Sequence, residues 1–219
     1  DQPDHDQQNL NRRSVEWIVG SAHGDRIAIS ANVRGIEGGA GDFVFDLRKA
    51  GHLFVSLGSG NNTLIVGEGE LVVQGGAGAD RYVLTEPSAS LVVQNSTPRD
   101  AIVVTWKPVH ASAAYGRERP HDLMIRLAQD AGRESAGVIR IEDHCPGDLG
   151  LHAGRTLALR ETAEGWQLVS REEGPRPADG AEKLASGTPS CPGAESAQGH
   201  VGIADDGDVS AWVAVLLSF

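Results

Sequence analysis

The chain is poor in aromatic residues and in positive charge. Phe, Trp and Tyr make up 5% of its 219 residues, which argues against a large aromatic core and suits thin strands joined by tight turns. The 19 Lys and Arg residues stand against 30 Asp and Glu, so the net charge is −11. This balance disfavours nucleic acid and anionic membranes as main partners and permits cation binding, although acidity alone is common among secreted proteins.

Cysteines and long apolar runs are also scarce. The 2 cysteines, Cys145 and Cys191, are too few for a disulfide framework, and the sequence leaves open whether they pair. The longest apolar run, Trp212 to Leu217, is far too short to cross a bilayer, so no transmembrane segment is expected. The chain starts at Asp1 without a signal peptide, and we expect it to be a piece or a processed product of something longer.

The familiar catalytic motifs are missing, since nothing matches G-x-S-x-G, H-E-x-x-H or a P-loop. The tightest histidine cluster, His144 with Cys145 and His152, lacks a zinc-ligand spacing. Adjacent residues of a strand point to opposite faces, so His144 is not expected to activate Cys145. Surface or core histidines are the favoured interpretation of the cluster.

Glycine is abundant instead, with 28 residues, close to twice the usual ~7%. The densest stretch, Gly75 to Val83, reads G-G-A-G-A-D-R-Y-V and fits the nonapeptide G-G-x-G-x-D-x-U-x, in which U is a large apolar residue. Its glycines allow backbone angles that a Cβ forbids, and Asp80 offers a hard oxygen to a cation. Tyr82 is expected to turn inward and fill a core.

Degraded copies of this pattern recur along residues 20–106. The glycine-rich turns begin at Gly20, Gly38, Gly58, Gly75 and Asn95, with steps of 18, 20, 17 and 20 residues. The second and third copies are one residue short before the acidic position, the third carries Asn there, and the fifth keeps its aspartate but loses its glycines. A period in this range is typical of a solenoid.

Each period also contains a second short apolar strand, near residues 32–36, 52–57, 70–73 and 90–93. We therefore predict an all-β fold, a parallel β-roll or β-helix solenoid of about five rungs of 17–20 residues, followed by a small β extension. Alternation predicts that one set of side chains shares a face: Ile27, Ile29, Phe43, Phe45, Tyr82, Leu84, Ile102 and Val104. The opposite turns lack the nonapeptide, so any metal is expected along one edge only.

The series of turns resembles the RTX (haemolysin-type) calcium-binding repeats of secreted bacterial proteins. The resemblance covers residues 20–106, and a D-L-x-I-x-L strand from Asp122 with a V-x-I-x-D strand ending at Asp143 extends it. It implies that carboxylates and glycine carbonyls of stacked turns gather oxygens around Ca2+. The candidate ligands, with Asp80 the strongest, are Asp25, Asp42, Asn61, Asn62, Gly75, Gly76, Gly78, Asp80 and Asp100.

The remaining segments follow from composition. Residues 1–13 are predicted to form a flexible lead-in and residues 14–106 the roll. Residues 107–170 are predicted to form a β-strand extension packing on the roll, with strands at 122–127 and 137–143 and a hairpin within 157–169. Residues 171–208, rich in Gly, Pro and Ser, are predicted to be a flexible loop, and residues 209–219 a C-terminal strand.

The resemblance implies an extracellular bacterial protein, part of a larger toxin or adhesin. The predicted function is a non-catalytic calcium-binding module that assists secretion, extracellular folding or target attachment, with a host surface or another domain of the parent protein as further partners. Two alternatives stay open. One is a polysaccharide-active enzyme using carboxylate pairs such as Asp42 with Asp46 or Glu68 with Glu70. The other is a calcium-free structural solenoid serving as an interaction surface.

Overall fold

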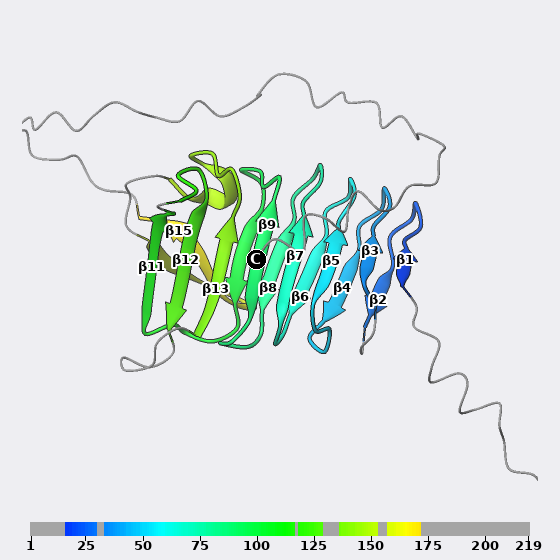
Figure 1. The fold of residues 1–219 in the computed structure, drawn as a ribbon, viewed down its shortest axis with the longest axis horizontal. Helices are drawn as coiled ribbons and strands as arrows, with labels where there is room; N and C mark the ends of the chain where they lie inside the picture. Colours follow the sequence, from blue (N-terminus) through cyan, green and yellow to red (C-terminus); the bar gives the residue numbers. More distant parts are fainter. Residues whose placement is uncertain (1–15, 30–32, 117, 129–135, 153–156, 172–219) are drawn as a thin grey trace, which may run out of the picture. The chain divides into compact units, whose positions relative to one another are not determined.

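The computed structural model describes residues 16–29, 33–116, 118–128, 136–152 and 157–171. All of them belong to the first of two units into which the chain divides, residues 1–189 and 190–219. They form two β-sheets and one short 3₁₀ turn, η1 (Asp148–Gly150) (Figure 1). The predictions for residues 1–13 and 209–219, and for the loop at 171–208 beyond Arg171, lie outside the described residues.

The first ten strands alternate between the two sheets, so that the chain winds as a solenoid. Sheet A holds the odd-numbered strands β1 (Trp17–Val19), β3 (Gly35–Glu37), β5 (Leu53–Ser56), β7 (Glu70–Gln74) and β9 (Ser90–Gln94). Sheet B holds the even-numbered strands β2 (Arg26–Ala28), β4 (Val44–Leu47), β6 (Thr63–Val66), β8 (Arg81–Leu84) and β10 (Ala101–Val104). Neighbours within each set are parallel, which confirms the predicted all-β parallel solenoid.

The core between the sheets consists of apolar side chains that stack in register from rung to rung. Strand alternation sends every second residue inward, and parallel pairing then places residues of similar size above one another. In sheet B the fully buried column is Phe45, Leu64, Tyr82 and Ile102, and in sheet A it is Ile36, Val55, Val73 and Val93. The inward turn of Tyr82 predicted from the nonapeptide is therefore confirmed.

The C-terminal extension lengthens both sheets and does not form a separate layer on the roll. Sheet A continues in the order β9-β13-β12-β11 with β11 (His110–Tyr115), β12 (Leu123–Ala128) and β13 (Ala136–Ile141), and β13 pairs with β9 in parallel. Sheet B continues with the hairpin β14 (Leu157–Thr162) and β15 (Gly165–Ser170), whose second strand pairs antiparallel with β10. Strand β11 was not predicted, because its small residues show no apolar alternation.

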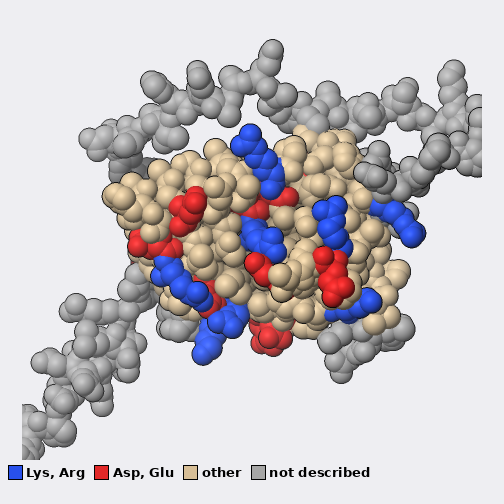
Figure 2. All heavy atoms as spheres, turned by 180° about the vertical axis from the view of Figure 1, so that it is seen from behind, with Lys and Arg blue, Asp and Glu red and all other residues tan. Residues whose placement is uncertain are grey.

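The charged residues on the outside of the roll are paired rather than gathered by sign. Figure 2 shows basic and acidic side chains interspersed over the face opposite to that of Figure 1. Asp46 lies 2.7 Å from Arg48 and 3.8 Å from Arg26, and Arg81 lies 2.8 Å from Glu164. The part of the chain that the structure describes contains no helix of the length and hydropathy that crossing a membrane requires.

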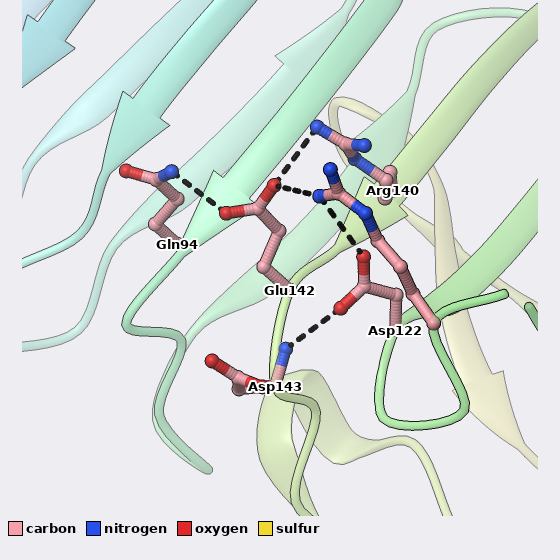
Figure 3. Close-up of polar contacts among 6 residues, drawn as sticks. Gln94, Asp122, Arg140, Glu142 and Asp143 are labelled. Carbon is pink, nitrogen blue, oxygen red and sulfur yellow. Dashed lines mark hydrogen bonds and ion pairs between the residues drawn. The ribbon is translucent and has the colours of Figure 1, made fainter. Parts of the chain in front are cut away.

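A polar network fastens the extension to the last rung of the roll (Figure 3). Glu142, just after β13, accepts a hydrogen bond from Gln94 Nε2 on β9 at 2.7 Å. Its other oxygen lies 2.8 Å from Arg140 Nη2 and 3.4 Å from Arg119 Nη1, and Arg119 also lies 3.8 Å from the buried Asp122. The carboxylate of Glu142 thus connects three segments that are distant in sequence.

Glycines make the close stacking of successive turns possible. A Cβ at Gly58 would overlap the carbonyl oxygen of Gly39, and a Cβ at Gly76 would overlap the carbonyl oxygen of Gly58. The same overlap occurs two residues further along each turn. A Cβ at Gly60 would meet the carbonyl oxygen of Gly41, and a Cβ at Gly78 would meet that of Gly60. The backbone of each turn therefore occupies the space that a side chain of the next turn would need.

Substitution of one stacked glycine should separate two rungs. We expect Gly76→Ala to lower the free energy of unfolding by about 3 kcal/mol, because the methyl group meets backbone that has no rotamer to adopt. Gly51 is the matched control, since it has no heavy atom within 4 Å of an added Cβ and no positive φ. Gly51→Ala should leave the protein unchanged or up to about 1 kcal/mol more stable. Urea unfolding measures both, and equal effects would contradict the stacking account.

Candidate functional site: the glycine-rich edge

Five turns lie above one another where the chain passes from sheet A to sheet B. They comprise residues 20–25, 38–43, 58–62, 75–80 and 95–100, and together we call them the glycine-rich edge. The register of the strands that follow aligns the last residue of each turn in one column: Asp25, Phe43, Asn62, Asp80 and Asp100. This inner column is where the nonapeptide places its acidic residue.

Side chains of the inner column bind the backbone of the preceding rung. Phe43 N donates to Asn62 Oδ1 at 3.0 Å, Asn62 N to Asp80 Oδ1 at 3.1 Å, and Asp80 N to Asp100 Oδ1 at 2.9 Å. The three acceptors Asn62, Asp80 and Asp100 are only 1%, 1% and 3% exposed. A buried amide or carboxylate without partners would be costly, so these bonds both satisfy the side chains and join consecutive turns.

The remaining polar atoms of this ladder also find partners. Asn62 Nδ2 donates to Gly60 O at 2.9 Å and to Asp80 Oδ1 at 3.0 Å. The second carboxylate oxygen of Asp80 accepts Gly76 N at 3.3 Å, and that of Asp100 accepts Thr97 N at 2.7 Å. Both oxygens of each buried carboxylate therefore face N–H groups of the turns.

A second, exposed ladder runs beside the first with the opposite polarity. Asp42 Oδ1 accepts Asn61 N at 2.7 Å, and Asn61 Oδ1 accepts Ala79 N at 2.9 Å, so here the side chain binds the following rung. Asp42 lies in this outer ladder because it stands one position before the inner column, which Phe43 occupies in that turn. Asp25 is exposed and accepts Ser21 Oγ within its own turn at 2.8 Å.

The nine candidate ligands therefore fall into separate groups. Asn62, Asp80 and Asp100 meet in the inner ladder, Asp42 and Asn61 in the outer one, and Asp25 in neither. The three glycines serve the backbone: Gly75 N donates to Gln94 O at 2.8 Å, while Gly76 and Gly78 give room for the preceding turn.

The buried pair of carboxylates is electrostatically strained. Burial raises the pKa of Asp100 to about 6, and the neighbouring charge of Asp80 contributes in the same direction. Burial likewise raises the pKa of Asp80, although hydrogen bonds from Asn62 and Gly76 oppose it. Tyr82 lies nearby, with its hydroxyl buried and without a hydrogen-bond partner, and burial together with Asp100 and Asp80 raises its pKa well above 10.

The described surroundings of these carboxylates consist of hydrogen-bond donors. Calcium takes about six to eight oxygen ligands, whereas the oxygens of Asp80 and Asp100 face N–H groups, which repel a cation. Within the described ranges no three His, Cys, Asp or Glu residues are grouped so that they would hold a metal ion. The arrangement supports a hydrogen-bonded ladder, and calcium binding stays a prediction.

The loop from Glu142 to His152 covers the last turn of the edge. Leu149 N donates to Thr97 O at 2.9 Å, and Asp148 Oδ2 accepts Cys145 N at 3.0 Å and Ser96 Oγ at 3.4 Å. The ladder thus ends against a folded loop. Asp148 was missed by sequence reasoning, although the preceding Pro146-Gly147 pair marks a turn in which an aspartate commonly binds backbone N–H groups.

The histidine and cysteine of this loop have structural surroundings. His144 is 2% exposed, its Nδ1 lies 3.1 Å from the Tyr115 hydroxyl, and burial lowers its pKa. Cys145 is part of a disulfide bond, and the other cysteine, Cys191, lies outside the described residues. A disulfide sulfur is not a thiol nucleophile, so the cysteine has no free thiolate to offer.

The raised pKa of Asp100 predicts a stability that depends on pH. A group whose folded pKa exceeds its unfolded value stabilises the fold when protonated, and this stabilisation is lost as pH rises through the folded value, about 6. Asp100→Asn keeps the acceptor for Asp80 N and removes the titration. Relative to this variant, the wild type should gain stability as pH falls from about 7.5 to about 4. A difference in chemical unfolding free energy that is constant over this range would contradict the burial account.

Comparisons with protein-family models, with curated proteins and with solved structures found no match to this chain.

Proposed function

We propose that the chain is a non-catalytic β-solenoid module that holds its shape without calcium and serves as a structural, interaction-bearing part of an extracellular protein. The observation that carries this proposal is the inner ladder. Asn62, Asp80 and Asp100 each use a side-chain oxygen to hold the backbone of the preceding rung. These bonds supply the connection between turns that calcium supplies in the repeats that the sequence resembles.

The ladder favours rigidity because it adds to connections that already exist. Consecutive rungs share main-chain hydrogen bonds in both sheets, apolar columns in the core and glycine contacts along the edge. In a solenoid each repeat contacts only its neighbours, so stability depends on the strength of each interface. Side-chain hydrogen bonds between neighbouring turns strengthen each interface at the glycine-rich edge, where the main-chain hydrogen bonds of the sheets end.

Three of the four carboxylates that would serve a glycan-active site, Asp42, Asp46 and Glu70, are engaged in other contacts. Asp46 accepts hydrogen bonds from Arg48 at 2.7 and 2.8 Å, and this contact lowers its pKa. A general acid needs a raised pKa. Asp42 holds Asn61 N, and Glu70 lies 3.8 Å from His52 on the exposed surface. These surroundings support the non-catalytic proposal.

An extracellular location is supported by the disulfide of Cys145. Disulfides persist in oxidising surroundings and are rare in the reducing cytosol. The net charge of −11 and the mixed charges in Figure 2 also fit a protein that does not bind nucleic acid as its main partner. Secretion, an association with a toxin and attachment to a host surface remain parts of the proposal that rest on the RTX resemblance.

Thermal unfolding in calcium and in chelator tests the proposal. We expect the melting temperature and the strand signal in circular dichroism to be the same in both buffers, because the ladder needs no metal. Asp80→Ala should lower the free energy of unfolding by at least about 2 kcal/mol in both buffers, since it leaves the buried Asn62 N without its acceptor and Asn62 Nδ2 with only one of its two.

Asp42→Ala is the matched control, because it removes an aspartate of the same edge from an exposed position where water replaces it. It should cost less than about 1 kcal/mol. A melting temperature that rises with calcium in the wild type, and no longer does so in Asp80→Ala, would overturn the metal-free proposal and establish the predicted calcium site.

A further inference from the structure

The described sheets end in four outer strands, and one of them differs from the rest. These strands are β1 and β11 in sheet A and β2 and β14 in sheet B. Strands β1 and β2 are only three residues long, and β14 carries the exposed charges of Arg160 and Glu161. Short length and charge are common protections against pairing with another chain.

Strand β11 has neither protection. It extends over six residues, His110–Tyr115, with the sequence H-A-S-A-A-Y, and it contains no Asp, Glu, Lys, Arg or Pro. Four of the six residues, His110, Ser112, Ala113 and Ala114, are exposed. An outer strand of this length without charged side chains is a template for a further strand.

The pairing with β12 shows which backbone groups are available. Gly116 N donates to Asp122 O at 3.0 Å, in register with the pairs Ala114 to Met124 and Ser112 to Arg126. In an antiparallel pair, hydrogen bonding alternates along the strand, so the N–H and C=O groups of Ala111, Ala113 and Tyr115 point away from β12. These six groups lie along the outer edge.

We propose that β11 pairs with β11 of a second copy, antiparallel about a two-fold axis at Ala113. This register sets Ala113 opposite Ala113, Ala111 opposite Tyr115, and Ser112 opposite Ala114 of the partner. It opposes no charges, and it matches all three outward donors and acceptors of one copy with those of the other. The same strand therefore presents a self-complementary edge, as a two-fold interface requires.

The interface is expected to be weak. Six residues from each chain bury far less surface than the roughly 800 Å² per partner of a standard interface. We expect a dissociation constant in the range of about 10 µM to about 1 mM. Pairing would join the two copies of sheet A into one continuous sheet. The proposal does not depend on calcium and extends the structural role to assembly.

Sedimentation equilibrium of the full chain, in a concentration series up to about 1 mM, tests the proposal. Wild type should pass from monomer to dimer. Ala113→Lys sets two ammonium groups opposite each other at the axis, and Ala113→Pro removes an N–H that β12 does not use. Each should weaken association by about tenfold or more. Ser56→Lys, on the outer face of β5 in the interior of sheet A, adds the same charge away from the β11 edge and should leave association unchanged.

Circular dichroism and melting temperature confirm that each variant is folded. Hydrogen exchange provides a second readout: higher concentration should protect the amides of Ala111, Ala113 and Tyr115, which alternate with amides already bonded to β12. A chain that stays monomeric throughout the series would overturn the proposal. So would a dimer that both Ala113 variants leave intact, or one that Ser56→Lys weakens equally.

Discussion

The structure depends on the close approach of successive turns along the glycine-rich edge. A Cβ at Gly76 or Gly58 would overlap the carbonyl of the turn beneath it, so these positions accept no side chain without separation of the rungs. The approach brings the N–H groups of one turn within hydrogen-bonding distance of Asn and Asp side chains of the next. The sheets, the core columns and the ladder all share the rung spacing that this contact permits, about 4.7 to 4.9 Å between strands.

Burial of the inner ladder raises the pKa values of its two carboxylates and restricts their orientation. Asp80 and Asp100 lie in successive rungs, nearly inaccessible to water, and burial raises the pKa of both. Their charges are balanced by backbone N–H donors rather than by lysine or arginine. A carboxylate that accepts two or three such bonds is held in one orientation, and this fixed orientation is what a rigid module needs.

Most of the fold could be predicted from the sequence, because the turn spacing and the alternation of apolar residues are local signals. The positions of Phe45, Tyr82 and Ile102 in the core follow directly from strand alternation. The β11 strand could not be predicted in this way, since Ala and Ser carry little information about burial. Its place at the end of sheet A results from its pairing with β12, which no local pattern encodes.

The site was predicted only in part. Asp80 and Asp100 stand together as the nonapeptide suggests, but Asp42 lies in the outer ladder because it occurs one position before the inner column of its turn. The residue aligned with Asp80 in that rung is Phe43, which contributes only its N–H. One oxygen of each carboxylate accepts a hydrogen bond within its own turn, but the other accepts from a turn about 20 residues away. The distant partners depend on the rung register, which the sequence motif alone does not define.

Amide hydrogen exchange in calcium-free buffer tests the central claim most directly. If the ladder holds the turns without metal, the amides of Phe43, Asn62 and Asp80 should exchange only through global unfolding, as slowly as the amides of the core strands. Rapid exchange at these three amides, comparable to that of the exposed Ala77 and slowed only when calcium is added, would contradict the account.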